Sequence, residues 1–232
     1  MIPRIIHQIW LGDKNKMPVD LMKTVKDMHF DWKYILWSEN NLGDLINQDR
    51  YNEVLYSRNS GETKYLKLAD IVRYEKLFNY GGIYIDADSK CHKSFNDLLE
   101  GKFFAAYENE TKRPGLIANG VIGSIPNHPI LGECINQIGR LSNKAIIRKS
   151  AFKVTGPILL TKVIQQSENT DIQIYPSRYF YPVHYSVSMT HLLEGKFKDC
   201  YTHQLWNSTI RNRRSLFMRA SNKIYRLFNR SI

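Results

Sequence analysis

Residues 67–90 constrain the fold most, because their pattern changes from helix to strand at a double glycine. Apolar residues in the first half recur at the three- and four-residue spacing of an amphipathic helix. Gly81 and Gly82 predict the end of that helix, since glycine readily takes the left-handed conformation common at helix C-termini. The short β-prone run at 83–85 then predicts a buried strand. This order of elements favours an α/β sheet, in which ligands bind at the carboxyl ends of the strands.

Four charged residues on these elements are candidates for a functional site. Asp70 and Arg73 are three residues apart, so a helix places them on one face. Asp86 and Asp88 directly follow the strand and, one residue apart on an extended backbone, point to the same side. Burying both carboxylates unpaired would cost on the order of several kcal/mol. A hard divalent cation shared with a substrate phosphate is their simplest partner, while an ordinary turn after a core strand is the alternative.

Helix, double glycine, strand and Asp-x-Asp together resemble the sugar-binding region of glycosyltransferase family 32, most strongly over residues 60–90. The resemblance implies a GT-A-type, Rossmann-like α/β fold with a mixed central sheet that binds a nucleotide-diphosphate sugar. It favours a UDP-hexose donor, with GDP-mannose possible. It also implies that Asp86 and Asp88 hold Mn²⁺ or Mg²⁺, and that Asp70 and Arg73 orient the hydroxyls of the donor sugar. Tyr84 would close over the sugar or diphosphate, with a core position in the strand as the alternative.

Three further segments are similar to family motifs. The first predicted strand ends at Trp10, and the resemblance places such a ring against the nucleotide base; core packing is the alternative. Asn119 corresponds to an asparagine near the donor sugar in relatives, but it could equally be a turn residue. The run Thr155-Gly156-Pro157 resembles a T-G-P motif at the start of a helix on the acceptor side. A capping turn, with Thr155 as N-cap and proline in the first turn, is compatible with that role.

Residues 201–207 resemble a histidine-tryptophan motif that lies close to the metal and the diphosphate in this family. The resemblance makes His203 the candidate third metal ligand, although an isolated histidine is more often a hydrogen-bonded core residue. Trp206 and Asn207 are the candidates for contact with the diphosphate. Many members have Ser-Trp where this chain has Asn-Ser-Thr, so the assignment within this segment stays open.

The length and composition suit one catalytic domain followed by a basic tail. A chain of 232 residues with 43% hydrophobic residues can bury one core. We expect residues 1–209 to form the catalytic domain and residues 210–232 a basic amphipathic helix, because no acidic residue follows Asp199. Such a helix is typical of a membrane-surface element, or it docks on its own domain. Three widely spaced cysteines and the lack of a signal-peptide pattern predict a cytoplasmic protein, peripheral on the inner face of the membrane.

We therefore expect a metal-dependent, retaining hexosyltransferase that acts on a glycan or lipid-linked saccharide in bacterial capsule or O-antigen synthesis. Retention follows only from the resemblance, since no residue is identifiable as a covalent nucleophile. One alternative is a metal-dependent phosphohydrolase, although those enzymes usually have Thr or Val where Ser89 follows the motif. The other is a non-catalytic basic protein that binds membranes or nucleic acid. The net charge of +11 fits it, but we find no recognisable nucleic-acid-binding module and expect no nucleic-acid partner.

Overall fold

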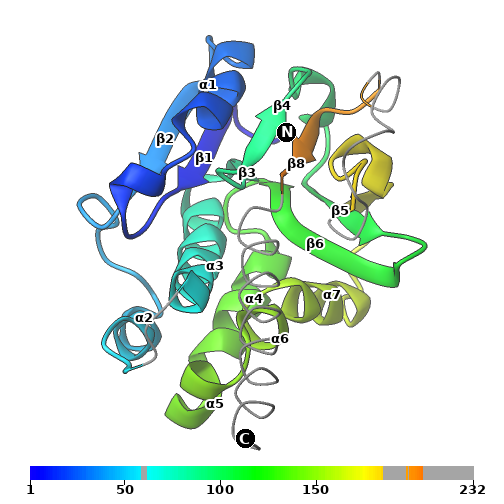
Figure 1. Cartoon of the computed structure of the whole chain (residues 1–232). Helices are drawn as coiled ribbons and strands as arrows, with labels where there is room; N and C mark the ends of the chain where they lie inside the picture. Colours follow the sequence, from blue (N-terminus) through cyan, green and yellow to red (C-terminus); the bar gives the residue numbers. More distant parts are fainter. Residues whose placement is uncertain (59–61, 185–196, 198, 206–232) are drawn as a thin grey trace, which may run out of the picture.

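The computed structural model describes residues 1–58, 62–184, 197 and 199–205. They form a mixed sheet with helices packed on it (Figure 1). The central sheet has the spatial order β2 (Lys33–Trp37), β1 (Ile5–Ile9), β3 (Gly82–Ile85), β6 (Arg113–Ser124), β5 (Phe103–Asn109) and β7 (Ile172–Tyr175). A separate two-stranded sheet pairs β4 (Ser89–Cys91) with β8 (Thr202–Gln204).

The strand directions confirm the expected mixed sheet and define one functional edge. Strand β1 is parallel to both β2 and β3, whereas β6 is antiparallel to β3 and β5, and β7 is parallel to β5. The carboxyl ends of β1, β2 and β3 therefore meet at one edge. Open α/β sheets bind their ligands at such an edge.

Helices cover the face of the sheet on which α3, the longest helix in the described part of the chain, packs. The α-helices of the described residues are α1 (Val19–Met28), α2 (Gln48–Leu55), α3 (Glu62–Tyr80), α4 (Pro129–Gly139), α5 (Asn143–Arg148), α6 (Ala151–Val154) and α7 (Pro157–Gln165). Helix α3 packs on β1, β3 and α4, and α7 packs on β6. On the other side, α1 lies beside β4.

Strand β3 is buried on both faces, which explains its unbroken apolar sequence. Tyr84 belongs to the apolar cluster that α3 completes through residues such as Leu68 and Ile71. Ile83 and Ile85 belong to the opposite cluster, which includes Val25 of α1. Side chains alternate between the two faces of a strand, so consecutive residues of β3 enter different cores.

The double glycine ends α3 as predicted, and the backbone requires glycine at both positions. Gly81 has a φ of 63° and Gly82 a φ of 99°, conformations that side chains rarely adopt. A Cβ on Gly81 would lie 2.6 Å from Cδ of Pro126, and one on Gly82 would lie 2.5 Å from the carbonyl oxygen of Ile5. Both glycines therefore let β3 enter the sheet directly after the helix.

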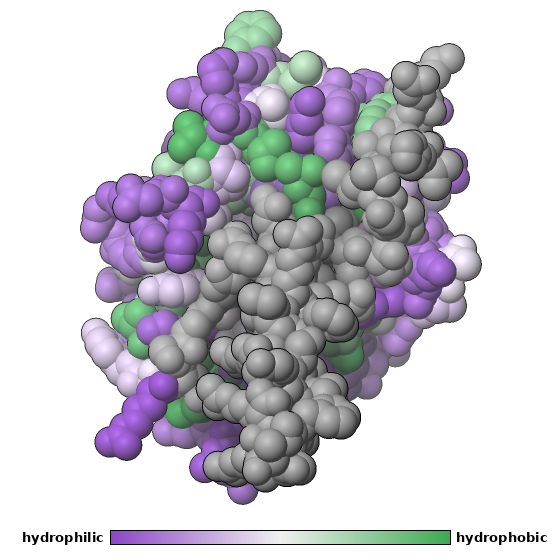
Figure 2. Space-filling view, in the orientation of Figure 1, coloured by the Kyte–Doolittle hydropathy of each residue, from purple (hydrophilic) through white to green (hydrophobic). Residues whose placement is uncertain are grey.

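Other expectations can be compared with the described part of the chain. Cys91, Cys134 and Cys200 are buried free thiols. In the view of Figure 2, most of the surface of the described residues is hydrophilic, and the larger apolar groups lie in the upper half. Within the described ranges, we find no helix long and apolar enough to cross a membrane. The predicted helix at 210–232 lies outside the described residues, as do Trp206 and Asn207.

Candidate active site

The first residue after β3, Asp86, is held in place by both neighbouring strands. Its backbone nitrogen donates to the carbonyl oxygen of Gly120 in β6 at 2.8 Å. The side-chain amide of Gln8 in β1 lies 3.4 Å from the backbone oxygen of Asp86. The carboxylate consequently projects from the middle of the sheet edge where the strand topology predicts a ligand site.

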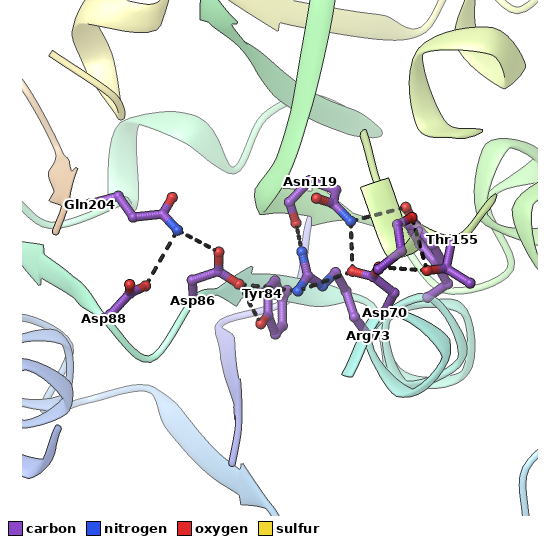
Figure 3. A network of polar contacts seen from close by, with 10 residues as sticks. Asp70, Arg73, Tyr84, Asp86, Asp88, Asn119, Thr155 and Gln204 are labelled. Atoms are coloured by element: carbon purple, nitrogen blue, oxygen red, sulfur yellow. Dashed lines mark hydrogen bonds and ion pairs between the residues drawn. The ribbon is translucent and has the colours of Figure 1, made fainter. Parts of the chain in front are cut away.

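The carboxylates of Asp86 and Asp88 face a common position (Figure 3). Nε2 of Gln204 in β8 donates to Oδ2 of Asp86 at 2.8 Å and lies 3.3 Å from Oδ1 of Asp88. The other oxygen of Asp86, Oδ1, accepts from the Tyr84 hydroxyl at 2.7 Å and from Nη2 of Arg73 at 3.1 Å. Both aspartates are half-buried, so the pair is also open to solvent.

Behind this pair, a buried polar network joins α3 to β6 and to the segment before α7. Asp70 accepts from Nδ2 of Asn119 at 2.8 Å and from the hydroxyl of Thr155 at 2.7 Å. Nη2 of Arg73 lies 3.4 Å from Oδ1 of Asp70, and Nη1 donates to the carbonyl oxygen of Asn119. The guanidinium also stacks 4.1 Å from the ring centroid of Tyr84. One turn of α3 thus brings an acid and a base to the back of Asp86, as their spacing predicts.

The electrostatics of Asp70 reflect its burial. Only 6% of this residue is exposed. Burial raises the pKa of its carboxyl from 3.8 to about 6, against the opposing effects of Arg73 and of the hydrogen bonds from Thr155 and Asn119. The carboxylate therefore ionises just below neutral pH.

The donor set at the sheet edge fits a hard divalent cation. Carboxylate and amide oxygens are the ligands that Mg²⁺ and Mn²⁺ prefer, and Asp86, Asp88 and Gln204 supply both kinds. These side chains fit against β6 because Gly120 has no side chain of its own. A Cβ on this glycine would lie 2.7 Å from Oδ2 of Asp86, 3.0 Å from Oε1 of Gln204 and 3.1 Å from the Tyr181 hydroxyl.

The structure does not bring His203 to the two aspartates. Side chains alternate along β8, and Nδ1 of His203 lies 2.6 Å from Nε2 of His92 while Gln204 contacts the aspartates. Burial lowers the pKa of His203 to about 4, together with the nearby His92 and Lys90. Among the residues that the structure describes, no three His, Cys, Asp or Glu side chains form a group able to hold a metal ion.

The structure also bears on the alternatives for Trp10 and Thr155, which were core packing and a helix N-cap. Trp10 follows β1 at the same sheet edge, half-buried, and its indole nitrogen donates to the backbone oxygen of Asp13 at 3.1 Å. The alternative in which Thr155 is the N-cap of the following helix is wrong. Gly156 is the N-cap of α7, with Pro157 in the first turn, and the Thr155 hydroxyl is bonded to Asp70.

The sequence interpretation missed Gln204 and the role of Gly120. A glutamine has no spacing signature, and the alternation of residues 202–204 could only have indicated that His203 and Gln204 face opposite ways. A glycine in a strand can mark the close approach of another group, but the neighbour that approaches Gly120, Asp86, is known only from the structure.

Comparisons with known proteins place the chain in a family. Residues 17–105 match the family model described as a glycosyltransferase sugar-binding region containing a DXD motif. The mimivirus protein named "Uncharacterized glycosyltransferase L373" is 30% identical over 190 residues, which cover 78% of this chain and 74% of that protein. Inositol phosphoceramide mannosyltransferase 3 of Schizosaccharomyces pombe is 31% identical over 69% of this chain. The chain spans only 44% of that enzyme's length.

A solved structure shows the same fold. The PaToxG glycosyltransferase superposes with a TM-score of 0.57 at 20% identity, over 71% of this chain and 69% of its own. This likeness confirms the GT-A-type fold expected from the sequence. The matched DXD region and the mimivirus relative show that the chain belongs to the family of glycosyltransferases whose sugar-binding region contains a DXD motif.

Proposed function

We propose that this protein is a metal-dependent glycosyltransferase that moves a hexose from a nucleotide-diphosphate sugar to a glycan or lipid-linked saccharide. The observation that supports it best is the convergence of Asp86 and Asp88 on one half-exposed position, where a single amide nitrogen contacts both. Two carboxylates at a strand end that face one point suit a cation shared with a diphosphate. The buried network behind them keeps one of these carboxylates, Asp86, in a fixed orientation.

Each side chain of the network has a role in this proposal. Asp86 and Asp88 would hold the cation, which would act as a Lewis acid for the charge that develops on the β-phosphate as the nucleoside diphosphate leaves. Arg73 and Tyr84 orient the Asp86 carboxylate by donating to its Oδ1. Asp70 and Arg73 would also orient the hydroxyls of the sugar, the carboxylate accepting and the guanidinium donating, while Asn119 and Thr155 hold the Asp70 carboxylate.

The relatives' names bear on donor and acceptor. Several are named as mannosyltransferases that act on inositol phosphoceramide, and a human relative as an alpha-1,4-N-acetylglucosaminyltransferase. These names support a hexose-type sugar and an acceptor that includes a lipid, and they make a mannose donor worth testing beside UDP-hexoses. Retention of configuration, contact of Trp10, Trp206 and Asn207 with the nucleotide, a peripheral membrane location and a role in bacterial capsule or O-antigen synthesis stay predictions.

The test is nucleotide release from a panel of UDP- and GDP-sugars with Mn²⁺. We compare the wild-type protein with Asp88→Asn and, as a matched control, with Asp20→Asn, an exposed aspartate in the first turn of α1. Slow hydrolysis of one donor should depend on the metal and fall by about 10²-fold or more in Asp88→Asn, as when other charge-stabilising groups are removed. Asp20→Asn should match wild type. Equal activity of wild type and Asp88→Asn would disprove the proposal, and release of inorganic phosphate would favour a phosphohydrolase.

A further inference from the structure

The side-chain amide of Gln204 contacts both aspartates at the edge of the sheet. Its Nε2 lies 2.8 Å from Oδ2 of Asp86 and 3.3 Å from Oδ1 of Asp88. Its Oε1 faces Gly120, where an added Cβ would lie 3.0 Å from it. Ionised carboxylates only accept hydrogen bonds, and the NH₂ end of the amide is the end that faces them.

These separations match those between neighbouring ligands of an octahedral cation. Oxygen ligands lie about 2.1 Å from Mg²⁺, which puts adjacent ligands about 3.0 Å apart. The nitrogen of Gln204 is already at such a separation from one oxygen of each aspartate. A half-turn of the amide about its last side-chain bond exchanges Oε1 with Nε2 and requires no movement of β8. The exchange would turn an acceptor oxygen toward both aspartates.

The backbone of β8 holds Gln204 in this register. Gln204 pairs with Ser89 across the two-stranded sheet, and the nitrogen of Leu205 donates to the carbonyl oxygen of Asp88 at 3.0 Å. His203 points to the other side, toward His92. Bringing His203 to the aspartates would require a one-residue shift of β8, which would turn every side chain of the strand to the opposite face.

We propose that Gln204 is the third protein ligand of the cation, through Oε1, and that its Nε2 holds Asp86 and Asp88 in place before the cation binds. This inference rests on the proposed function, which requires the cation. It also couples the cation to β8, since the ligand belongs to the strand whose Leu205 is bonded to Asp88. The cation site would then be complete only when β8 is docked on β4.

The test is Mn²⁺ affinity, measured on the full chain by the loss of the free Mn²⁺ signal in electron paramagnetic resonance. Gln204→Leu should bind Mn²⁺ at least about 10-fold more weakly than wild type. Gln204→Glu should bind at least as tightly as wild type, because it adds an anionic oxygen ligand of the same length. Gln173→Leu, the same substitution at an exposed glutamine of β7, should leave the affinity unchanged. The glutamate variant also separates loss of the ligand from a general loosening of β8, because it changes the same position and keeps an oxygen ligand.

A second readout identifies the ligand atom. Electron spin echo modulation of the bound Mn²⁺ should show no directly coordinated nitrogen, because the amide binds through oxygen. A coordinated imidazole nitrogen would assign the position to His203 and overturn the inference. Affinity that is lost in Asp88→Asn but unchanged in Gln204→Leu would also overturn it, while leaving the proposed function intact. Affinity unchanged in both variants would refute the metal-dependent function itself.

Discussion

A methyl group on Gly120 should disable the site with little effect on the fold. Gly120 does not have a left-handed backbone, so alanine brings no conformational strain there. Its Cβ would nevertheless lie 2.7 Å from Oδ2 of Asp86, whereas ordinary contact begins at 3.4 Å. The carboxylate must therefore move by about 0.7 Å, the difference between these distances. Misplacement of a reacting group by about 1 Å can reduce catalysis by 10²-fold.

We expect kcat/KM for donor hydrolysis to fall by about 10²-fold in Gly120→Ala, which corresponds to about 2.7 kcal/mol of transition-state stabilisation. Overpacking should lower the free energy of unfolding by only about 1–3 kcal/mol. Gly101→Ala is the matched control, because that glycine is exposed, has no left-handed backbone and has no atom within 4 Å of an added Cβ. Nucleotide release and thermal unfolding are measured on both variants. Wild-type kcat/KM in Gly120→Ala, or an equal loss in Gly101→Ala, would refute the reasoning.

Two further predictions concern the network behind Asp86. Because the folded-state pKa of Asp70 is raised from 3.8 to about 6, its contribution to stability is present below about pH 4 and is lost as the pH rises through about 6. Denaturant titrations without metal measure the free energy of unfolding of wild type and Asp70→Asn. The difference between them should fall by up to roughly 3 kcal/mol from pH 4 to pH 7. A difference that stays constant with pH would contradict the raised pKa of Asp70. Tyr84→Phe removes the hydroxyl that donates to Asp86 but keeps the ring beside Arg73, so kcat/KM should fall about 10-fold. Tyr80→Phe, at an exposed tyrosine, should show no change, and equal activity of the two variants would exclude an orienting role for the Tyr84 hydroxyl.

Much of the site could be predicted from the sequence because its central parts are local. The spacing of Asp70 and Arg73 determines that they share a face of α3. Asp86 and Asp88 directly follow β3 as expected, but their backbone is not extended: the nitrogen of Ser89 donates to the carbonyl oxygen of Asp86 at 3.1 Å, and this turn brings both carboxylates to Gln204. The double glycine marks the junction between the two elements, because few other residues adopt its backbone angles. These are relations between residues a few positions apart, which the geometry of helices and strands dictates directly.

The tertiary structure determines which residues from distant elements join the site. Asn119 reaches Asp70 because β6 pairs with β3, and Thr155 reaches it because α6, which ends just before Thr155, packs on α3. The choice between His203 and Gln204 depends on one residue of register between β8 and β4. A pattern along the chain specifies that neighbours in a strand face opposite ways, but not which of them faces a given partner. That choice is made by the packing and backbone pairing of segments more than a hundred residues apart, which no local spacing encodes.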